Sequence, residues 1–200
     1  MRKGMICVLM ISLLLSACGG TEGESGDALA LKLRGEFLAA DSCTGTAVVT
    51  ADYGQRVYRY EMSFVSDEEQ TALTLIAPET VAGLTARLSW EEGSVLEYDG
   101  AVIETGPLNE GGLTPVSAIP AMLRTLREGY LDTCVLEEQE EGKATLRITS
   151  RDPAMEPGQG TETVMWFAGE PMRPVRGEIW QDNLCVIQCE FSTFSNQGKK

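Results

Sequence analysis

Cysteines are the side chains in this sequence whose positions point most directly to chemistry. Cys18 ends a short apolar run, where its thiol can act as the nucleophile that accepts a covalent group. Cys7 lies inside the same run, and the rest of the chain holds Cys43, Cys134, Cys185 and Cys189. The sequence contains no histidine, which excludes Ser-His-Asp and Cys-His catalysis and leaves no imidazole ligand for zinc. No other catalytic constellation is visible, so we predict a binding protein, with no enzymatic activity, cofactor or metal.

The first residues have the pattern of a secretory signal. Two basic residues precede the apolar run Met5–Leu15, which is shorter than the roughly 20 apolar residues that a membrane-spanning helix needs. The tetrapeptide Leu15–Cys18 resembles the lipobox of bacterial lipoproteins, in which the cysteine receives a diacylglyceryl group and the signal is cut just before it. We therefore predict a signal peptide at 1–17, lipidation at Cys18 and a lipidated flexible tether at 18–26. An ordinary signal peptide with an incidental cysteine is the alternative.

Composition bounds the rest of the chain. Residues 18–200 number 183, enough for one domain with a substantial core, which we place at 27–200. They carry 14 basic and 30 acidic residues, a net charge near −16, which disfavours nucleic acid as a partner and repels anionic lipid headgroups. Attachment at the extracytoplasmic face of the cell membrane must therefore depend on the acyl chains of Cys18.

An even number of cysteines in an exported chain favours disulfides. Cys185 and Cys189 lie four residues apart in a predicted strand, or roughly 13 Å at about 3.3 Å per residue, so they cannot pair with each other. If two bonds form, each of these cysteines reaches one of Cys43 and Cys134. Free buried thiols and a four-cysteine zinc site are the alternatives.

Two segments have the apolar spacing of helices. The first is 27–40, with Asp27 as its predicted N-cap. The second is Leu113–Tyr130, where Thr114 before Pro115 fits an N-cap followed by a first-turn proline, and a glycine fits the C-terminal end. Pro120 falls inside the second segment, so we expect a bend or a fresh start there.

Most of the remaining sequence alternates between apolar and polar residues. Short alternating runs recur at roughly 8–12-residue intervals and are separated by turn sequences such as YDG and QDN, which indicates a meandering antiparallel sheet of ten or eleven strands. Two amphipathic helices are available to cover one face of such a sheet. The sequence thus predicts a mainly β fold of the α+β type: a large curved antiparallel sheet that forms an incomplete β-barrel, covered by an N-terminal helix and a mid-chain lid helix.

The order of these elements resembles the LolA/LolB superfamily of lipoprotein carriers and receptors. The stretches that carry the resemblance are Leu73–Gly100, Leu113–Tyr130 and Gly160–Phe191. Locally the similarity is closest to lipid-anchored LolA-like proteins of single-membrane bacteria, including spore germination lipoproteins. The resemblance implies an incomplete barrel closed by a helical lid, with an apolar cavity that takes acyl chains.

Two functions follow as hypotheses. The first is binding of lipid or lipoprotein acyl chains in a cavity lined by the lid helix and the sheet, although these side chains would equally fill a solid core. Its candidate residues are Tyr60, Met62, Phe64, Trp90, Val116, Ile119, Met122, Leu123 and Leu126. The alternative is a non-catalytic scaffold that holds a cell-envelope protein, such as an amidase acting on spore cortex.

Overall fold

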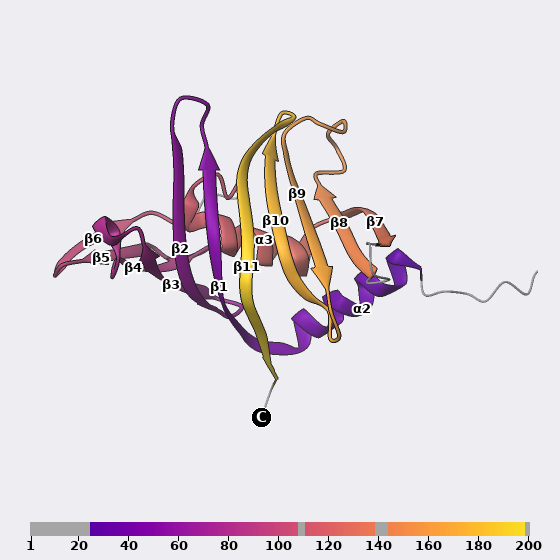
Figure 1. The fold of residues 1–200 in the computed structure, drawn as a ribbon, viewed down its shortest axis with the longest axis horizontal. Helices are drawn as coiled ribbons and strands as arrows, with labels where there is room; N and C mark the ends of the chain where they lie inside the picture. Colours follow the sequence, from indigo (N-terminus) through magenta and orange to yellow (C-terminus); the bar gives the residue numbers. More distant parts are fainter. Residues whose placement is uncertain (1–24, 108–110, 139–143, 199–200) are drawn as a thin grey trace, which may run out of the picture.

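The computed structural model describes residues 25–107, 111–138 and 144–198 (Figure 1). The predicted signal peptide and Cys18 lie outside the described residues, as does most of the predicted tether. No helix in the described part of the chain is long and apolar enough to cross a membrane.

A single antiparallel sheet of 11 strands forms the body of the molecule. Its first half is a meander with a short 3-10 helix between the third and fourth strands: β1 (Ala40–Asp52), β2 (Val57–Ser66), β3 (Gln70–Ala77), η1 (Glu79–Val81), β4 (Thr85–Ser89), β5 (Ser94–Tyr98) and β6 (Ala101–Thr105). Its second half is another meander: β7 (Leu131–Glu138), β8 (Ala144–Arg151), β9 (Thr161–Ala168), β10 (Arg173–Gln181) and β11 (Leu184–Gly198). The strand order is β6-β5-β4-β3-β2-β1-β11-β10-β9-β8-β7.

The two meanders pair with each other at the centre of the sheet, and the two outermost strands of the sheet do not pair with each other. The long strands β1 and β11 pair from Ala40 opposite Gly198 to Ala51 opposite Ile187. β6 and β7 are the two edges, and they do not pair with each other, so the sheet is not closed. In Figure 1 these edges lie at opposite ends of the molecule. The helix α3 (Pro115–Glu128) connects them.

The sheet curves around α3. This helix contacts strands from β4 to β9 through the centre of the sheet. Seven adjacent strands span roughly 29 Å at about 4.8 Å per gap, whereas a 14-residue helix is about 21 Å long. A helix of that length contacts all of them only because the sheet bends toward it. The predicted incomplete barrel with a mid-chain helix over one face is therefore confirmed, as are the 11 strands.

Local turn chemistry explains how the chain reverses direction between neighbouring strands. Asp99 and Gly100 both have positive φ, at 50° and 77°, between β5 and β6. Asp182 and Asn183, at 50° and 65°, do the same between β10 and β11. Two-residue turns with positive φ at both positions match the twist of antiparallel strands, and Asp, Asn and Gly tolerate them best. The YDG and QDN sequences therefore form the hairpins that the sequence predicts.

The N-terminal helix α2 (Gly26–Ala39) starts slightly earlier than expected. Its N-cap is Ser25, whose hydroxyl accepts a hydrogen bond from the amide of Ala28 at 3.2 Å, so the prediction of Asp27 as N-cap is wrong. Asp27 lies in the first turn, where its charge suits the positive end of the helix dipole. An N-cap side chain accepts a hydrogen bond from the amide two or three residues after it, and Ser25 stands in that relation to Ala28.

The far end of α2 is held by aromatic side chains. Phe37, which is 1% exposed, lies 5.5 Å from the ring of Phe194 on β11 and 6.4 Å from that of Phe167 on β9. Phe64 of β2 lies 6.0 Å from Phe194 and continues the contact to the other half of the sheet. Gly45 of β1 lies beneath, where a Cβ atom would be 2.9 Å from the Phe64 ring. The cluster therefore fixes α2 at the junction of the two meanders.

Candidate functional site

The lid helix α3 begins and ends as its sequence predicts. The Thr114 hydroxyl accepts from the amide of Ser117 at 3.2 Å, and the Ser117 hydroxyl accepts from the amide of Thr114 at 3.1 Å, a reciprocal capping box. Gly129 ends the helix, and its amide bonds to the Thr125 carbonyl. The helix continues through Pro120, so the expected fresh start there is wrong, and the expected bend stays a prediction. Residues 117–123 are all buried, and this packing on both sides of the proline holds the helix continuous.

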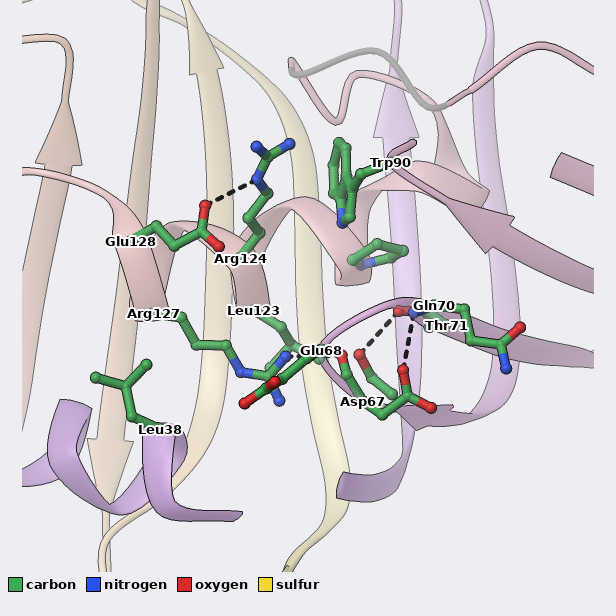
Figure 2. A pocket seen from close by; sticks show the side chains of 12 residues that line it. Leu38, Asp67, Glu68, Gln70, Thr71, Trp90, Leu123, Arg124, Arg127 and Glu128 are labelled. Atoms are coloured by element: carbon green, nitrogen blue, oxygen red, sulfur yellow. Dashed lines mark hydrogen bonds and ion pairs between the residues drawn. The ribbon is translucent and has the colours of Figure 1, made fainter. Parts of the chain in front are cut away.

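One side of α3 borders a pocket of about 180 Å³ (Figure 2). The pocket lies between the last turns of α3, the β2–β3 turn and Leu38 at the end of α2. Trp90, just after β4, forms part of its wall, and the Arg124 guanidinium lies 4.6 Å from the centre of the Trp90 ring. Arg124 also pairs with Glu128 at 3.1 Å. The pocket borders the edge of the interface between α3 and the sheet, because Leu123 lines it and belongs to the buried core.

Two arginines attach α3 to its surroundings through main-chain carbonyls. Arg34 of α2 donates to the carbonyls of Leu126 at 2.8 Å and Gly129 at 2.6 Å, which satisfies two acceptors at the C-terminal end of α3. Arg127 of α3 donates to the Asp67 carbonyl in the β2–β3 turn at 2.7 Å. Neither arginine was among the residues singled out from sequence. The sequence pattern alone predicts that a charged residue in an amphipathic helix is exposed to solvent. The carbonyls that these two arginines bind lie 60 or more residues away in the sequence.

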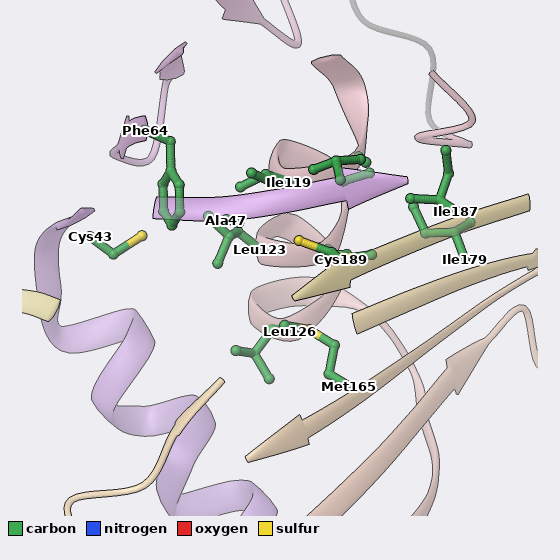
Figure 3. Close-up of a cluster of buried hydrophobic side chains, with 14 of the residues drawn as sticks. Cys43, Ala47, Phe64, Ile119, Leu123, Leu126, Met165, Ile179, Ile187 and Cys189 are labelled. Carbon is green, nitrogen blue, oxygen red and sulfur yellow. The ribbon is translucent and has the colours of Figure 1, made fainter. Parts of the chain in front are cut away.

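The inner face of α3 is buried against the sheet (Figure 3). Ile119, Leu123 and Leu126 gather with Ala47 of β1 and Cys189 of β11. Six of the nine predicted cavity residues are at most 2% exposed and belong to this one core: Met62, Phe64, Ile119, Met122, Leu123 and Leu126. Tyr60, Trp90 and Val116 are partly buried at its periphery. The structure thus brings the predicted residues together, with their side chains packed against one another.

A glycine lets α3 approach the sheet closely. A Cβ atom at Gly177 of β10 would lie 2.5 Å from the sulfur of Met122, so the absent side chain is where Met122 sits. Met165 pairs with Gly177 from β9 and is 3% exposed, and Met62 is fully buried on β2. Methionine side chains are unbranched and adapt to irregular spaces. The interface between α3 and the sheet therefore contains side chains that can repack.

The predicted disulfides are wrong, because all four cysteines of the described chain are free. Cys134 and Cys189 lie in one cross-strand row with three strands between them, and the four inter-strand spacings amount to roughly 19 Å. Cys43 lies opposite Asn196, seven residues from Cys189 on β11, or roughly 23 Å, and Cys185 is farther still. Cys134 and Cys43 lie near opposite ends of α2, which is about 21 Å long. No pair approaches the roughly 7 Å between Cα atoms that a bridge needs.

The four thiols should differ in reactivity. Burial raises the pKa of the Cys43 thiol to about 11 and raises the pKa of Cys189, which is 0% exposed, further. Burial also raises the pKa of Cys134 and Cys185, but these two remain partly accessible. Because the thiolate is the reactive form, we expect an alkylating reagent at pH 8 to label Cys134 and Cys185 in the native protein, and all four only after unfolding. Peptide mass spectrometry reads this directly, and fewer than four labelled thiols in denaturant without reductant would show a disulfide.

The described residues do not form the four-cysteine zinc site that the sequence leaves open as an alternative. No group of three or more Cys, Asp or Glu side chains there is arranged to hold a metal ion. The four cysteines are dispersed over β1, β7 and β11, which also removes the four-cysteine zinc site considered from the sequence.

Comparisons with known proteins find likeness in structure only. No family model matches the sequence, and none of the curated proteins matches it. A lipoprotein from Mycobacterium tuberculosis, LppX, is 16% identical with a TM-score of 0.48, over 84% of this chain and 95% of that chain. A LolA superfamily protein from Nitrosomonas europaea is 9% identical with a TM-score of 0.43, over 89% and 96%. A putative outer membrane lipoprotein-sorting protein domain from Vibrio parahaemolyticus is 11% identical with a TM-score of 0.47, over 86% and 92%.

The fold of this chain has the arrangement of elements that its sequence predicts. It has an open antiparallel sheet, a helix before the first strand and a helix that crosses one face between the sixth and seventh strands. This is the architecture that the resemblance to the LolA/LolB superfamily implies.

Proposed function

We propose that this protein is a membrane-anchored extracytoplasmic lipoprotein whose domain binds the acyl chains of lipids or lipoproteins between α3 and the sheet. The observation that carries the proposal is the position of α3. A single helix connects the two open edges of the sheet and covers its concave face with an apolar surface. The resemblance to lipoprotein carriers points to the same ligand class.

The attachment of α3 suits a lid that moves. Gly111 and Gly112 precede the helix, and Gly129 follows it. Its ties to α2 and the β2–β3 turn are hydrogen bonds from Arg34 and Arg127 to carbonyl oxygens, which water can replace. When α3 moves away from the sheet, the apolar surfaces of the helix and the sheet are both exposed to water. An acyl chain that binds between them removes these surfaces from water again.

The anchor is part of the same proposal. Only six residues separate Cys18 from Ser25, the N-cap of α2, so a fully extended tether spans about 25 Å at most. α2 exposes Leu31 by 62%. Its two basic and two acidic residues cancel, although the chain as a whole is strongly acidic. These features support a position of α2 close to the bilayer.

The test is lipid binding by residues 18–200, which contain every described helix and strand. We expect native mass spectrometry to show bound fatty acid after incubation with oleate, and affinity to rise from octanoate to oleate because each buried CH₂ contributes about 0.8 kcal/mol. At 100 times Kd, ligand stabilises the fold by about 2.7 kcal/mol, or a Tm increase of about 5–10 °C. A bare mass and an unchanged Tm with every chain length would reject acyl-chain binding.

A scaffold function is favoured by one separate observation. All five residues of the edge strand β6 are exposed, including Val102 and Ile103 at 59% each. An exposed apolar edge strand can accept a strand from another protein. Under this alternative the domain holds a cell-envelope protein, such as an amidase, and the spectra above would show no lipid.

A further inference from the structure

The pocket at the end of α3 contains a guanidinium that is only partly hydrogen-bonded. Arg127 uses Nη1 for the Asp67 carbonyl, at 2.7 Å. Its Nε and Nη2 atoms are buried and have no hydrogen-bond partner among the described residues. Buried N–H groups of a charged side chain are costly to leave unpaired. The site therefore has two strong donors in need of an acceptor.

The neighbouring carboxylates are already engaged or lie outside. Oδ1 of Asp67 accepts from the amides of Glu69 and Gln70, at 2.9 and 2.8 Å, and so stabilises its own turn. Glu128 pairs with Arg124 on the outer side of α3. Glu68 is exposed at the pocket rim and makes no ion pair with Arg127 in the described structure. Arg127 therefore lacks a carboxylate partner within the described chain.

The two unpaired atoms have the geometry of an anion site. Nε–H and Nη2–H lie on the same edge of a guanidinium and form the fork that binds both oxygens of a carboxylate or two oxygens of a phosphate. The pocket also has apolar walls from Leu38, Pro120 and Leu123. We propose that this pocket binds the anionic headgroup of a lipid, with Arg127 as the bidentate ligand of its carboxylate or phosphate. This inference rests on the acyl-chain function proposed above.

The dimensions suit a headgroup and not a whole lipid. The pocket holds about 180 Å³, which accommodates a carboxylate or phosphate with a few methylene groups. The remaining chain must continue elsewhere, and Leu123 connects the pocket wall to the buried core beneath α3. A lipid bound in this way places its charge at the mouth, while its acyl chain enters between helix and sheet. Arg127 would then determine which end of the lipid stays at the pocket and which end enters between α3 and the sheet.

The experiment compares ligands that differ only in the headgroup. Residues 18–200 are titrated with oleate, oleyl phosphate and oleyl alcohol, and Kd is measured by native mass spectrometry and calorimetry. We expect oleate and oleyl phosphate to bind at least about tenfold more tightly than oleyl alcohol, since charge-assisted hydrogen bonds contribute about 1.5–3 kcal/mol. A difference between the two anions identifies the headgroup that the pocket prefers. Equal affinity for all three ligands would overturn the headgroup site and leave acyl-chain binding intact, whereas no binding at all would reject both.

Three substitutions test whether the preference depends on the Nε and Nη2 fork of Arg127. Arg127→Gln should remove the tenfold preference for the anionic ligands over oleyl alcohol, while the loss of its tie to Asp67 changes the affinity for all three ligands by the same factor. Arg124→Gln removes the same charge from the same helix and pocket, but its guanidinium is already paired, so the preference should remain. Arg127→Lys keeps the charge without the fork and should retain only part of the preference. If Arg127→Gln keeps the full preference, or Arg124→Gln loses it equally, the assignment to Arg127 is overturned. Where Arg127→Gln fails to fold, Arg127→Lys and the wild-type ligand series decide the question.

Discussion

Replacing Cys18 by alanine is expected to abolish lipidation completely, so that no acyl group remains on the chain. The thiol is the only nucleophile at the end of the apolar run that can take the diacylglyceryl group. Each CH₂ group of an acyl chain that is buried in the bilayer contributes about 0.8 kcal/mol to membrane binding, and stable anchoring takes two acyl chains. When a detergent solution is separated into a detergent phase and an aqueous phase, the wild-type protein should therefore be found wholly in the detergent phase. Its intact mass should lack residues 1–17 and include the lipid.

The control for this prediction lies in the same segment. Cys7 is a second thiol inside the apolar run, but the lipobox pattern does not include it. Cys7→Ala should therefore leave the mass and the partitioning of the mature protein unchanged, while Cys18→Ala should give a chain that keeps residues 1–17 and carries no lipid. Lipid on the Cys18→Ala chain, or a wild-type chain cut at another position, would reject the anchor.

The sheet and the lid helix were predictable because each depends on local pattern. Alternation of apolar and polar residues identifies strands, and the sequence Thr114-Pro115 followed later by Gly129 identifies the ends of α3. Burial of Met62, Phe64 and Leu126 followed from the same periodicities. These features need no knowledge of which strand lies beside which.

The features that were missed depend on register and on distant partners. Whether Cys134 and Cys189 can pair is decided by the three strands between them, and composition alone favoured a bond that the sheet forbids. The same holds for Arg34 and Arg127, whose acceptors are backbone carbonyls and carry no sequence signal. The N-cap of α2 was misplaced by two residues because Asp27 and Ser25 are both good caps, and only the helix start separates them.

Replacing Met122 by aspartate is expected to lower the free energy of unfolding by at least about 4 kcal/mol. Met122 is 0% exposed and lies in the space left by Gly177, so the substitution removes packed atoms and buries a carboxylate with no designated partner. Urea unfolding followed by tryptophan fluorescence measures the loss. Met122→Leu should cost less than about 1.5 kcal/mol, because it keeps the volume. Val102→Asp, on the exposed strand β6, should stay within about 0.5 kcal/mol of wild type.

The same measurement reports the resting position of the lid. If Met122→Asp is nearly as stable as wild type, α3 does not rest against the sheet in solution, and the closed arrangement is not the ground state. If the loss is large, the closed state dominates, and any acyl chain must displace Met122 and its neighbours from Gly177 before it binds. The apparent affinity is then the intrinsic affinity multiplied by the fraction of open molecules. Substitutions that weaken the ties of α3, such as Arg34→Gln, should therefore tighten acyl binding while they lower stability, a pairing of effects that a solid core with no ligand would not produce.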